Sequence, residues 1–594
     1  IVSDSQLYDA ATLSIAEIEC GAITESTDAM MPILGPDADY GGAIVVYFPA
    51  GTSTNSAYYV NDSFDPAHDV YCTAPGDDGN DGLSPSTPKR TIQSIINRYL
   101  LKGGDIVWVD SGVYPEGNTV LNYQDRGQEG NPIRFVGALG ANGEPSTELT
   151  HDGTIGACIT FSTGSCYSSF ENMWLHGGEN GVLFTDYWTG RQSGITLDNV
   201  RISEVSGDAC SLYEATDFSL RNCQIYNYGT HGNSQFHTFS GLGISANFSG
   251  GQIENTVIFA SPGQSCIYAV DPWESDFHSG THFSLRNSIF ESSDNGVVIA
   301  SPWTVTSQYC SFFTTEGATV GLNPAATDLV GIDPLFADPL NGDFHLKSFA
   351  GRWDPNMNNG AGGWVSDSVV SPLMDAGDPN FDFSAEPVPN GGCINIGPHG
   401  GTAFASKTPD AYRNVIFVTP ETGETYRRAC RILWRYFGNG FQSGETIKFE
   451  YSADSGHTWN AIVGAEAVPV EAGFWSWDIT SMPSGSTYWI RATSNQDNYY
   501  AWTIGSFSIS KLSEYFINDL SMTNDVWCTA IGNDINDGLS ALTPKATLSS
   551  LLSVNDVEPG DVVHIDTGTY ILTSEIMVLN SDGGNSGSWV LFQG

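Results

Sequence analysis

The sequence has few basic residues. Lys and Arg together number 22 against 68 Asp and Glu, which gives a formal net charge of -46. A chain with this charge repels nucleic acid and anionic membranes, so we expect neither as a main partner. No apolar run approaches the length of a membrane span. The 11 Cys include no CxxC pair and no Cys/His cluster, which argues against a structural zinc site.

What the sequence does contain is a repeated Asn just ahead of an apolar pair. The repeated segments are FENMWL, LDNVRI, LRNCQI, IENTVI and LRNSIF. Their Asn residues are Asn172, Asn199, Asn222, Asn255 and Asn287. Spacings between 23 and 33 residues predict a repeat architecture. At a fixed bend an Asn tolerates a left-handed backbone, and its amide can hydrogen-bond the equivalent amide one repeat away. We therefore expect a stacked Asn ladder.

A second short apolar run follows most of these Asn residues. The runs are GVLF from Gly181, ACSL from Ala209, LGISA from Leu242, CIYAV from Cys266 and GVVIA from Gly296. Two or three short strands per repeat without helical periodicity predict a parallel β-helix, in which each coil buries its inner face on its neighbours. Cys210 and Cys266 fall inside these runs, so we expect both to be buried, while disulfides elsewhere stay open.

The chain ahead of the repeats predicts a cap. Residues 1–57 have no coil pattern and no assigned fold, although Ala11 to Cys20 would suit a short helix. Ile92, Ile95, Ile96, Tyr99 and Leu100 follow helical spacing, and Gly103 with Gly104 would end this helix. An amphipathic helix ahead of a first strand at Ile106 to Val109 would cover the open end of a β-helix.

The segments GDDGNDGLSPSTPKRTIQ and GDIVWVDSGVY then identify a likeness to a known family. They resemble the cap and first coil of right-handed parallel β-helix proteins of the pectin-lyase-like superfamily, and the resemblance covers 58–405. That superfamily contains lyases, hydrolases, epimerases, adhesins and structural proteins, so the resemblance implies the fold more than an activity. The Pro-, Gly- and Asp-rich stretch after Val330 resembles closing segments of β-helix domains in large bacterial surface proteins.

Two further units follow. Residues 406–512 alternate short strands with turns and resemble the Ig-like β-sandwich modules of secreted wall proteins. At Tyr515 the cap begins again, with Cys528, Asp566 and Tyr570 matching residues 456 positions earlier. We therefore expect 513–594 to start a second β-helix. Either the 594 residues are a piece of a longer tandem protein, or another copy completes this coil.

The loops after the second apolar runs hold aromatic and acidic side chains that could contact a glycan. The contact candidates are Trp188, Tyr213, Trp273 and Trp303. Sugar rings stack on aromatic faces, with nearby carboxylates accepting hydroxyl hydrogen bonds. The alternative is that these rings shield the loops or pack against a neighbouring chain.

Four residues are candidates for catalysis in the same loops. They are Arg191, His231, Asp271 and Glu274, which would serve as acid or base if the fold brings them together. A loop His is otherwise simply solvated. The resemblance weakens the catalytic hypothesis, because β-helix galacturonases need paired Asp, His-Gly and Arg-x-Lys, and calcium-dependent lyases need clustered Asp and a basic residue. Here the only Asp-Asp pair is in the cap, and Lys347 is the only Lys between 105 and 400.

Calcium is the one cofactor that we consider. Asp77, Asp78 and Asp81 supply carboxylates within one turn of the cap. The turn does not match an EF-hand, and side-chain turn chemistry explains Asn and Asp here without a metal.

The sequence thus predicts an all-β protein: a right-handed parallel β-helix, an Ig-like β-sandwich and the start of a second β-helix. The favoured function is an extracellular or cell-surface structural or adhesive protein of bacterial secreted type, a layer, fibre or stalk component whose partners are copies of itself. The alternatives are a polysaccharide lyase or glycoside hydrolase, and a non-catalytic glycan-binding protein.

Overall fold

The structure is a computed structural model of the 594-residue chain. It describes residues 56–115, 118–153, 156–162, 164–185, 192–213, 215–229, 242–247, 249–260, 264–269, 282–292, 296–299, 304–314, 319–325, 327–420, 422–438, 440–496, 500–502, 506–511, 513–555, 557, 560–572, 575–578 and 589–594. The helix predicted at Ala11 to Cys20 lies outside these residues. In the described part of the chain, no helix is long and apolar enough to cross a membrane.

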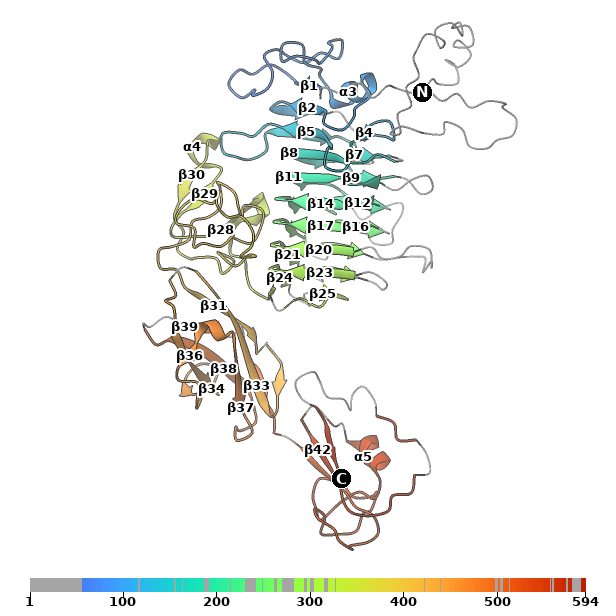
Figure 1. The fold of residues 1–594 in the computed structure, drawn as a ribbon, viewed down its shortest axis with the longest axis vertical. Coiled ribbons are helices and arrows are strands. Elements are labelled where there is room, and N and C mark those ends of the chain that lie inside the picture. Colours follow the sequence, from blue (N-terminus) through green and yellow to red (C-terminus); the bar gives the residue numbers. More distant parts are fainter. Residues whose placement is uncertain are drawn as a thin grey trace, which may run out of the picture.

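The described residues between 57 and 330 form a parallel β-helix, as predicted (Figure 1). The larger sheet contains β1 (Ala57–Val60), β2 (Ile106–Val109), β3 (Gly112–Tyr114), β5 (Ile133–Gly137), β6 (Thr147–His151), β8 (Ser168–Gly177), β11 (Thr196–Ser203), β14 (Phe218–Arg221), β15 (Gln224–Tyr226), β17 (Gly251–Glu254), β18 (Val257–Phe259), β20 (His282–Arg286), β21 (Ile289–Ser292), β23 (Thr304–Gln308), β24 (Ser311–Thr314) and β26 (Leu329–Val330). The second sheet contains β4 (Thr119–Leu121), β7 (Ala157–Phe161), β9 (Asn180–Phe184), β12 (Cys210–Tyr213), β16 (Ile244–Asn247), β19 (Ile267–Ala269), β22 (Val297–Ile299) and β25 (Thr319–Val320). A short pair, β10 (Gln192–Ser193) and β13 (Ala215–Thr216), joins two coils outside them.

The repeated Asn residues lie at the bend of the larger sheet. All five have positive φ, between 45° and 57°, the left-handed geometry that Asn tolerates. Asn199 Nδ2 donates to Asn172 Oδ1 at 2.8 Å, and Asn255 Nδ2 donates to Asn222 Oδ1 at 3.4 Å. Between these two pairs the row is interrupted, because Asn222 Nδ2 donates to Asp198 Oδ1 at 3.1 Å. At the far end, Asn287 Oδ1 accepts the backbone N–H of Asp378 at 2.7 Å.

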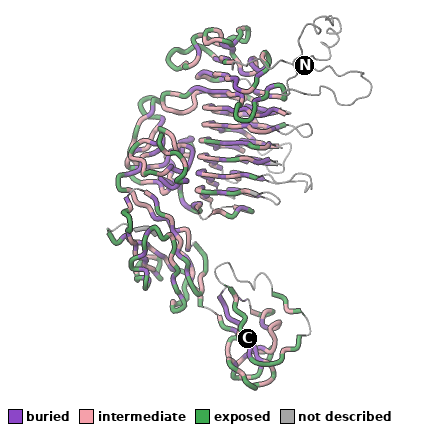
Figure 2. Tube along the Cα trace, viewed as in Figure 1, coloured by how far each residue is buried: buried purple, intermediate pink, exposed green. Residues whose placement is uncertain are grey.

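The interior of the coils is apolar, and Figure 2 shows buried residues along each of the successive coils. Inward positions repeat from coil to coil, so that Phe135 stacks on Phe170 with ring centroids 4.5 Å apart, and Phe290 stacks on Phe312 at 5.2 Å. Burying each such side chain contributes roughly 1.5–3 kcal/mol. Cys210 and Cys266 are fully buried, as predicted, and the described cysteines form no disulfide.

The cap helix is shorter than predicted. Helix α3 (Ile92–Arg98) places Ile92, Ile95 and Ile96 on the apolar end of the coils. It begins at Thr91, whose side chain accepts the N–H of Ser94, and it already ends at Tyr99 in an extended conformation. Leu100 is therefore exposed, and Gly103 and Gly104 lie beyond the helix end. A strand, β1, also precedes this helix and pairs with β2.

Residues 331–408 form a closing segment that packs on the outer face of the larger sheet (Figure 1). Its elements are β27 (Phe336–Asp338), the 3-10 turn η1 (Pro339–Asn341), β28 (Asp343–Leu346), β29 (Arg352–Asp354), α4 (Met357–Gly360) and β30 (Gly363–Val365). Phe344 packs against Tyr226 and Phe259 of the sheet. Ser406 and Thr408 hydrogen-bond Leu346 and Asp375, so residues 406–408 belong with this segment and not with the domain predicted to begin at 406.

A sandwich of two sheets follows. The first contains β31 (Asn414–Thr419), β33 (Ala429–Phe437) and β37 (Phe474–Asp478). The second contains β32 (Thr425–Tyr426), β34 (Thr446–Ser452), β35 (Asn460–Ala461), β36 (Val468–Pro469), β38 (Gly485–Ser494), β39 (Tyr500–Trp502) and β40 (Phe507–Ile509), with η2 (Val470–Ala472) beside them. Both sheets share one apolar core. The Ig-like identity of this sandwich stays a prediction.

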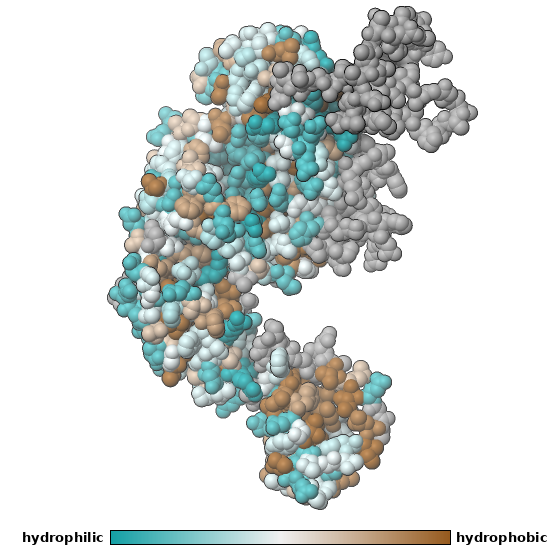
Figure 3. Space-filling view, viewed as in Figure 1, coloured by the Kyte–Doolittle hydropathy of each residue, from teal (hydrophilic) through white to brown (hydrophobic). Residues whose placement is uncertain are grey.

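The last unit is built like the first cap. Strands β41 (Glu514–Ile517), β42 (Val562–Ile565) and β43 (Leu591–Gln593) pair in parallel, and α5 (Leu548–Val554) packs beside them. Apolar side chains gather on its surface in Figure 3. Trp589 and Ile571 are 80% and 81% exposed.

Two of the buried carboxyl groups in the closing segment, those of Glu386 and Asp375, have raised pKa values. Glu386 is 3% exposed, and its Oε1 accepts the N–H groups of Asn395 and Gly401, while Oε2 has no hydrogen-bond partner. Burial, reinforced by the nearby Asp375 charge, raises the pKa of Glu386 to about 7 against the two hydrogen bonds. Burial also raises the pKa of Asp375 to about 7.

The Asn ladder predicts the effect of substitutions at Asn199. Asn199→Ala loses both the left-handed tolerance and the bond to Asn172, which costs roughly 2–3 kcal/mol of unfolding free energy. Asn199→Gly keeps the backbone geometry and costs roughly 1 kcal/mol. Denaturant unfolding followed by circular dichroism compares the two variants. Equal destabilisation by Ala and Gly would contradict this account of the bend.

Glu386 predicts a pH dependence of stability. The pKa of Glu386 is higher in the folded than in the unfolded chain. Its contribution to the free energy of unfolding is therefore complete below pH 4.5 and is lost as pH rises through about 7. Glu386→Gln mimics the protonated form, so at pH 8 its free energy of unfolding should exceed that of the wild type by up to roughly 3 kcal/mol. Its melting temperature at pH 8 should be higher accordingly. Thermal unfolding at pH 5 and pH 8 measures this, with the exposed Glu129→Gln as control. An unchanged pH dependence in Glu386→Gln would refute the assignment.

Candidate functional site

A row of polar side chains crosses the outer face of the larger sheet. Glu148, Trp174, Arg201 and Gln224 are register partners on β6, β8, β11 and β15. The next residue of each strand is apolar and buried in the coil interior. Since side chains alternate along a strand, the polar row faces outward, toward the closing segment.

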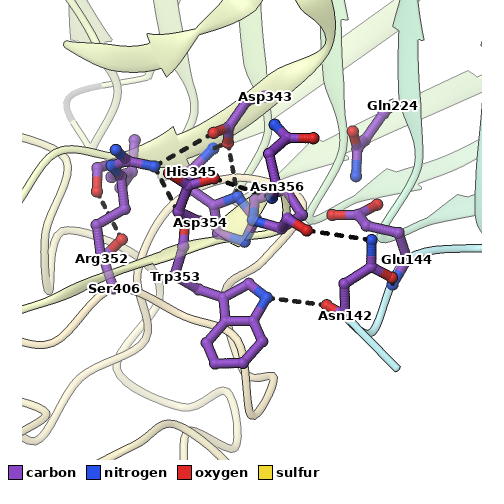
Figure 4. Close-up of polar contacts among 12 residues, drawn as sticks. Asn142, Glu144, Gln224, Asp343, His345, Arg352, Trp353, Asp354, Asn356 and Ser406 are labelled. Carbon is purple, nitrogen blue, oxygen red and sulfur yellow. Dashed lines mark hydrogen bonds and ion pairs between the residues drawn. The ribbon is translucent and has the colours of Figure 1, made fainter. Parts of the chain in front are cut away.

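The closing segment is tied to a turn between β5 and β6. Trp353 Nε1 donates to the carbonyl oxygen of Asn142 at 2.8 Å, and Asn142 Nδ2 donates to that of Pro355 at 3.4 Å (Figure 4). This turn carries Glu144, so the contacts hold its carboxylate between the sheet and β28. Cavities of about 460 Å³ and 320 Å³ both include Glu144 in their lining.

Glu144 forms an ion pair with the sheet. Its Oε2 lies 2.7 Å from a terminal nitrogen of Arg201, and both side chains are at most 15% exposed. The same Arg201 nitrogen donates to Gln224 Oε1 at 3.3 Å, and the guanidinium lies over the Trp174 ring at 5.6 Å. These contacts fix Arg201, so one oxygen of Glu144 is held in place.

His345 on β28 lies beside this pair. Its Nδ1 contacts Asp343 Oδ1 at 2.7 Å, and Arg352 contacts Asp343 Oδ2 at 3.2 Å (Figure 4). Burial acts to raise the pKa of Asp343, but the hydrogen bonds and charge of His345, with the charge of Arg352, hold it below its usual value. The His345 side chain is 1% exposed, and its Nε2 has no hydrogen-bond partner.

His399 completes the cluster. Its ring stacks on that of His345, with centroids 3.6 Å apart and an interplanar angle of 9°. Burial, with the neighbouring His345 and Arg201, holds the pKa of His399 well below its usual value. In the described part of the chain, only Glu144, His345 and His399 bring three metal-ligating groups within 4.8 Å of one another.

Another histidine on the same face has different surroundings. His176 contacts Glu148 through Nδ1 at 2.8 Å and Glu204 through Nε2 at 2.9 Å. Burial acts to lower the pKa of His176, but the hydrogen bonds and charges of Glu204 and Glu148 outweigh burial. The pKa of His176 therefore lies above its usual value. Both ring nitrogens are thus engaged, which leaves His176 no lone pair to offer.

Most site residues predicted from the sequence cannot be placed. The residues outside the described ones are Trp188, Arg191, His231, Asp271, Trp273, Glu274 and Trp303. Tyr213 ends β12 in the second sheet and is half-buried, on a different sheet from the polar row.

The calcium candidates build the cap turn. Asp77 accepts the N–H of Gly79, Asp78 accepts those of Arg90 and Thr91, and Asp81 accepts the N–H of Leu83 and the hydroxyl of Thr87. Their carboxylates are not among the described groups that converge on one point. These hydrogen bonds are of the kind that turns use without a metal, and calcium binding by Asp77, Asp78 and Asp81 stays a prediction.

The cluster around Glu144 was missed at the level of sequence. Its members come from a turn at 144, from β28 and from a loop at 399, and no spacing links them. The one local signal is the pairing of Asp343 with His345 in alternate positions of a Pro- and Gly-rich stretch.

Comparisons with known proteins give partial matches. The model of a family described as disaggregatase related matches residues 200–377, less than half of the chain. The alginate lyase of Paenibacillus sp. str. FPU-7 is 13% identical, with a TM-score of 0.24 over 40% of this chain and 94% of the lyase. The enzymatically active domain of bacteriophage CBA120 tailspike protein 2 is 10% identical, with a TM-score of 0.26 over 70% and 73%. TM-scores this low assign neither fold nor function. A search of curated proteins gives no match.

Proposed function

We propose that this protein is a stiff structural component of an extracellular or cell-surface layer, fibre or stalk, built from β-helix modules in tandem. The observation that carries the proposal is the duplicated cap. Asp110 accepts the N–H groups of Val70, Tyr71 and Cys72. Asp566 accepts those of Val526, Trp527 and Cys528. Two copies of so specific a network support two β-helix starts in one chain.

Further contacts are duplicated as well. Lys89 Nζ donates to the carbonyl oxygen of Asp78 at 2.6 Å, and Lys545 Nζ donates to that of Asp534 at 2.9 Å. Both lysines are nearly fully buried. Because an unpaired buried ammonium is costly, such a contact is retained only where the whole turn is formed. The second cap thus forms the same buried lysine contact as the first.

The joints between modules support stiffness. Arg435 of β33 donates to the carbonyl oxygens of Thr327 and Ala376, so the sandwich is held to the last coil and to the closing segment. On the other side, Arg427 lies 2.9 Å from Asp561, which also accepts the N–H of Ser513 at the start of the second cap. A half-buried guanidinium with fixed acceptors restrains orientation more than a flexible linker does.

The charge of the chain fits this role. A net charge of -46 keeps a surface protein soluble and repels polyuronates and nucleic acid. Glycan binding by the loop aromatics, and polysaccharide cleavage, are the competing functions, and one experiment separates them.

The purified full chain should be assayed against acidic and neutral polysaccharides, with and without EDTA, for cleavage and for binding. The structural function predicts no cleavage of any polymer, because the sequence has no Arg-x-Lys motif and only Lys347 between 105 and 400. Cleavage that is abolished in Asp271→Ala would contradict it and favour an enzyme.

Binding without cleavage has its own control. If binding is lost when Trp188, Trp273 and Trp303 are all replaced by Ala, the protein is a glycan-binding module. The matched variant Trp589→Ala removes a ring that is 80% exposed on the second cap and should leave binding intact.

A further inference from the structure

We propose that Glu144, His345 and His399 bind a divalent transition-metal ion, with Zn²⁺ as the expected ion, between the β-helix and its closing segment. The three offer two imidazole nitrogens and one carboxylate oxygen, all within 4.8 Å of one another. This donor set suits zinc, whereas calcium and magnesium prefer oxygen ligands alone. The site is independent of the structural function proposed above.

His345 provides the strongest evidence. Its side chain is 1% exposed, and Nε2 is buried without a hydrogen-bond partner. A buried polar atom left unpaired costs about 1–3 kcal/mol, so such atoms normally have a partner. A metal ion bound to Nε2 would supply the missing partner.

The other ring nitrogen of His345 is held as metal-binding histidines usually are. Nδ1 contacts Asp343 Oδ1 at 2.7 Å, and Asp343 is held in turn by Arg352. A carboxylate on Nδ1 fixes the ring orientation and leaves the lone pair on Nε2. Asp343 is therefore a positioning residue and not a ligand.

His399 and Glu144 enclose the same space. The His399 ring lies 3.6 Å from that of His345, and among the described residues only one oxygen of Glu144 is paired, with Arg201 at 2.7 Å. Ligands of a tetrahedral site with 2.1 Å bonds lie roughly 3.4 Å apart. To close on an ion from separations of up to 4.8 Å, at least one of the two stacked rings must tilt, because a metal lies in the plane of the imidazole that binds it. The 320 Å³ cavity lined by Glu144 and His399 gives the ion a path in.

The metal would join parts of the chain that are distant in sequence. Glu144 belongs to an early coil, while His345 and His399 belong to the closing segment. An ion held by all three would pin the closing segment to the β-helix. Binding to the folded state alone raises stability in proportion to the logarithm of metal concentration.

The test uses the full chain after treatment with EDTA and dialysis. Titration calorimetry with Zn²⁺ should give one saturable site per chain, and the melting temperature should rise. Co²⁺ in place of Zn²⁺ should give visible absorption bands of a low-symmetry site, whereas Ca²⁺ should not compete. His399→Ala and Glu144→Gln should each weaken Zn²⁺ binding at least about tenfold, and Asp343→Asn should do so through His345.

His176→Ala is the matched control. It removes a histidine from the same face, one whose two nitrogens already contact carboxylates, so Zn²⁺ affinity should stay at the wild-type value. Melting in EDTA checks that every variant is folded. Absence of saturable binding, or binding that is equal in the wild type, His399→Ala and Glu144→Gln, would overturn the proposal and indicate an adventitious ion on an acidic surface.

Discussion

Coil stacking is the interaction on which the whole molecule depends. Each coil pairs in register with the next, and its inner side chains are buried only because a neighbour covers them. Both ends of such a stack expose backbone groups and apolar surface, so they must be covered. Helix α3 covers one end, while the closing segment wraps the side of the larger sheet and the sandwich packs at the last coil. The second cap then provides a new first coil.

Three of the scarce basic residues lie where modules meet, and a fourth lies within the closing segment. Arg201 contacts the turn that anchors the closing segment, and Arg352 lies between two carboxylates within that segment. Arg435 joins the sandwich to the closing segment, and Arg427 joins it to the second cap. The chain has only 22 Lys and Arg against 68 acidic residues, and four of these few positive charges form the contacts described here.

Local patterns in the sequence predicted the coils and the duplicated cap, because each of these features depends on residues that are close together in the sequence. The five repeated Asn residues all adopt the expected left-handed bend, although Asp198 interrupts their hydrogen-bonded row. The end of the cap helix was predicted too far along the chain, because apolar spacing alone does not reveal that the backbone of Tyr99 is extended. The cluster of Glu144, His345 and His399 was not predictable, because only tertiary packing unites them. The absence of Cys motifs argues against a Cys-based zinc site, but it does not bear on ligands that only folding brings together.

Electron microscopy of the purified protein over a range of concentrations tests the central claim most directly. A stiff tandem rod predicts elongated particles of constant outline, in which the β-helix, the sandwich and the second cap keep one relative orientation, and which join end to end into filaments as concentration rises. Compact particles at every concentration, or particles whose second cap takes many positions relative to the β-helix, would contradict it.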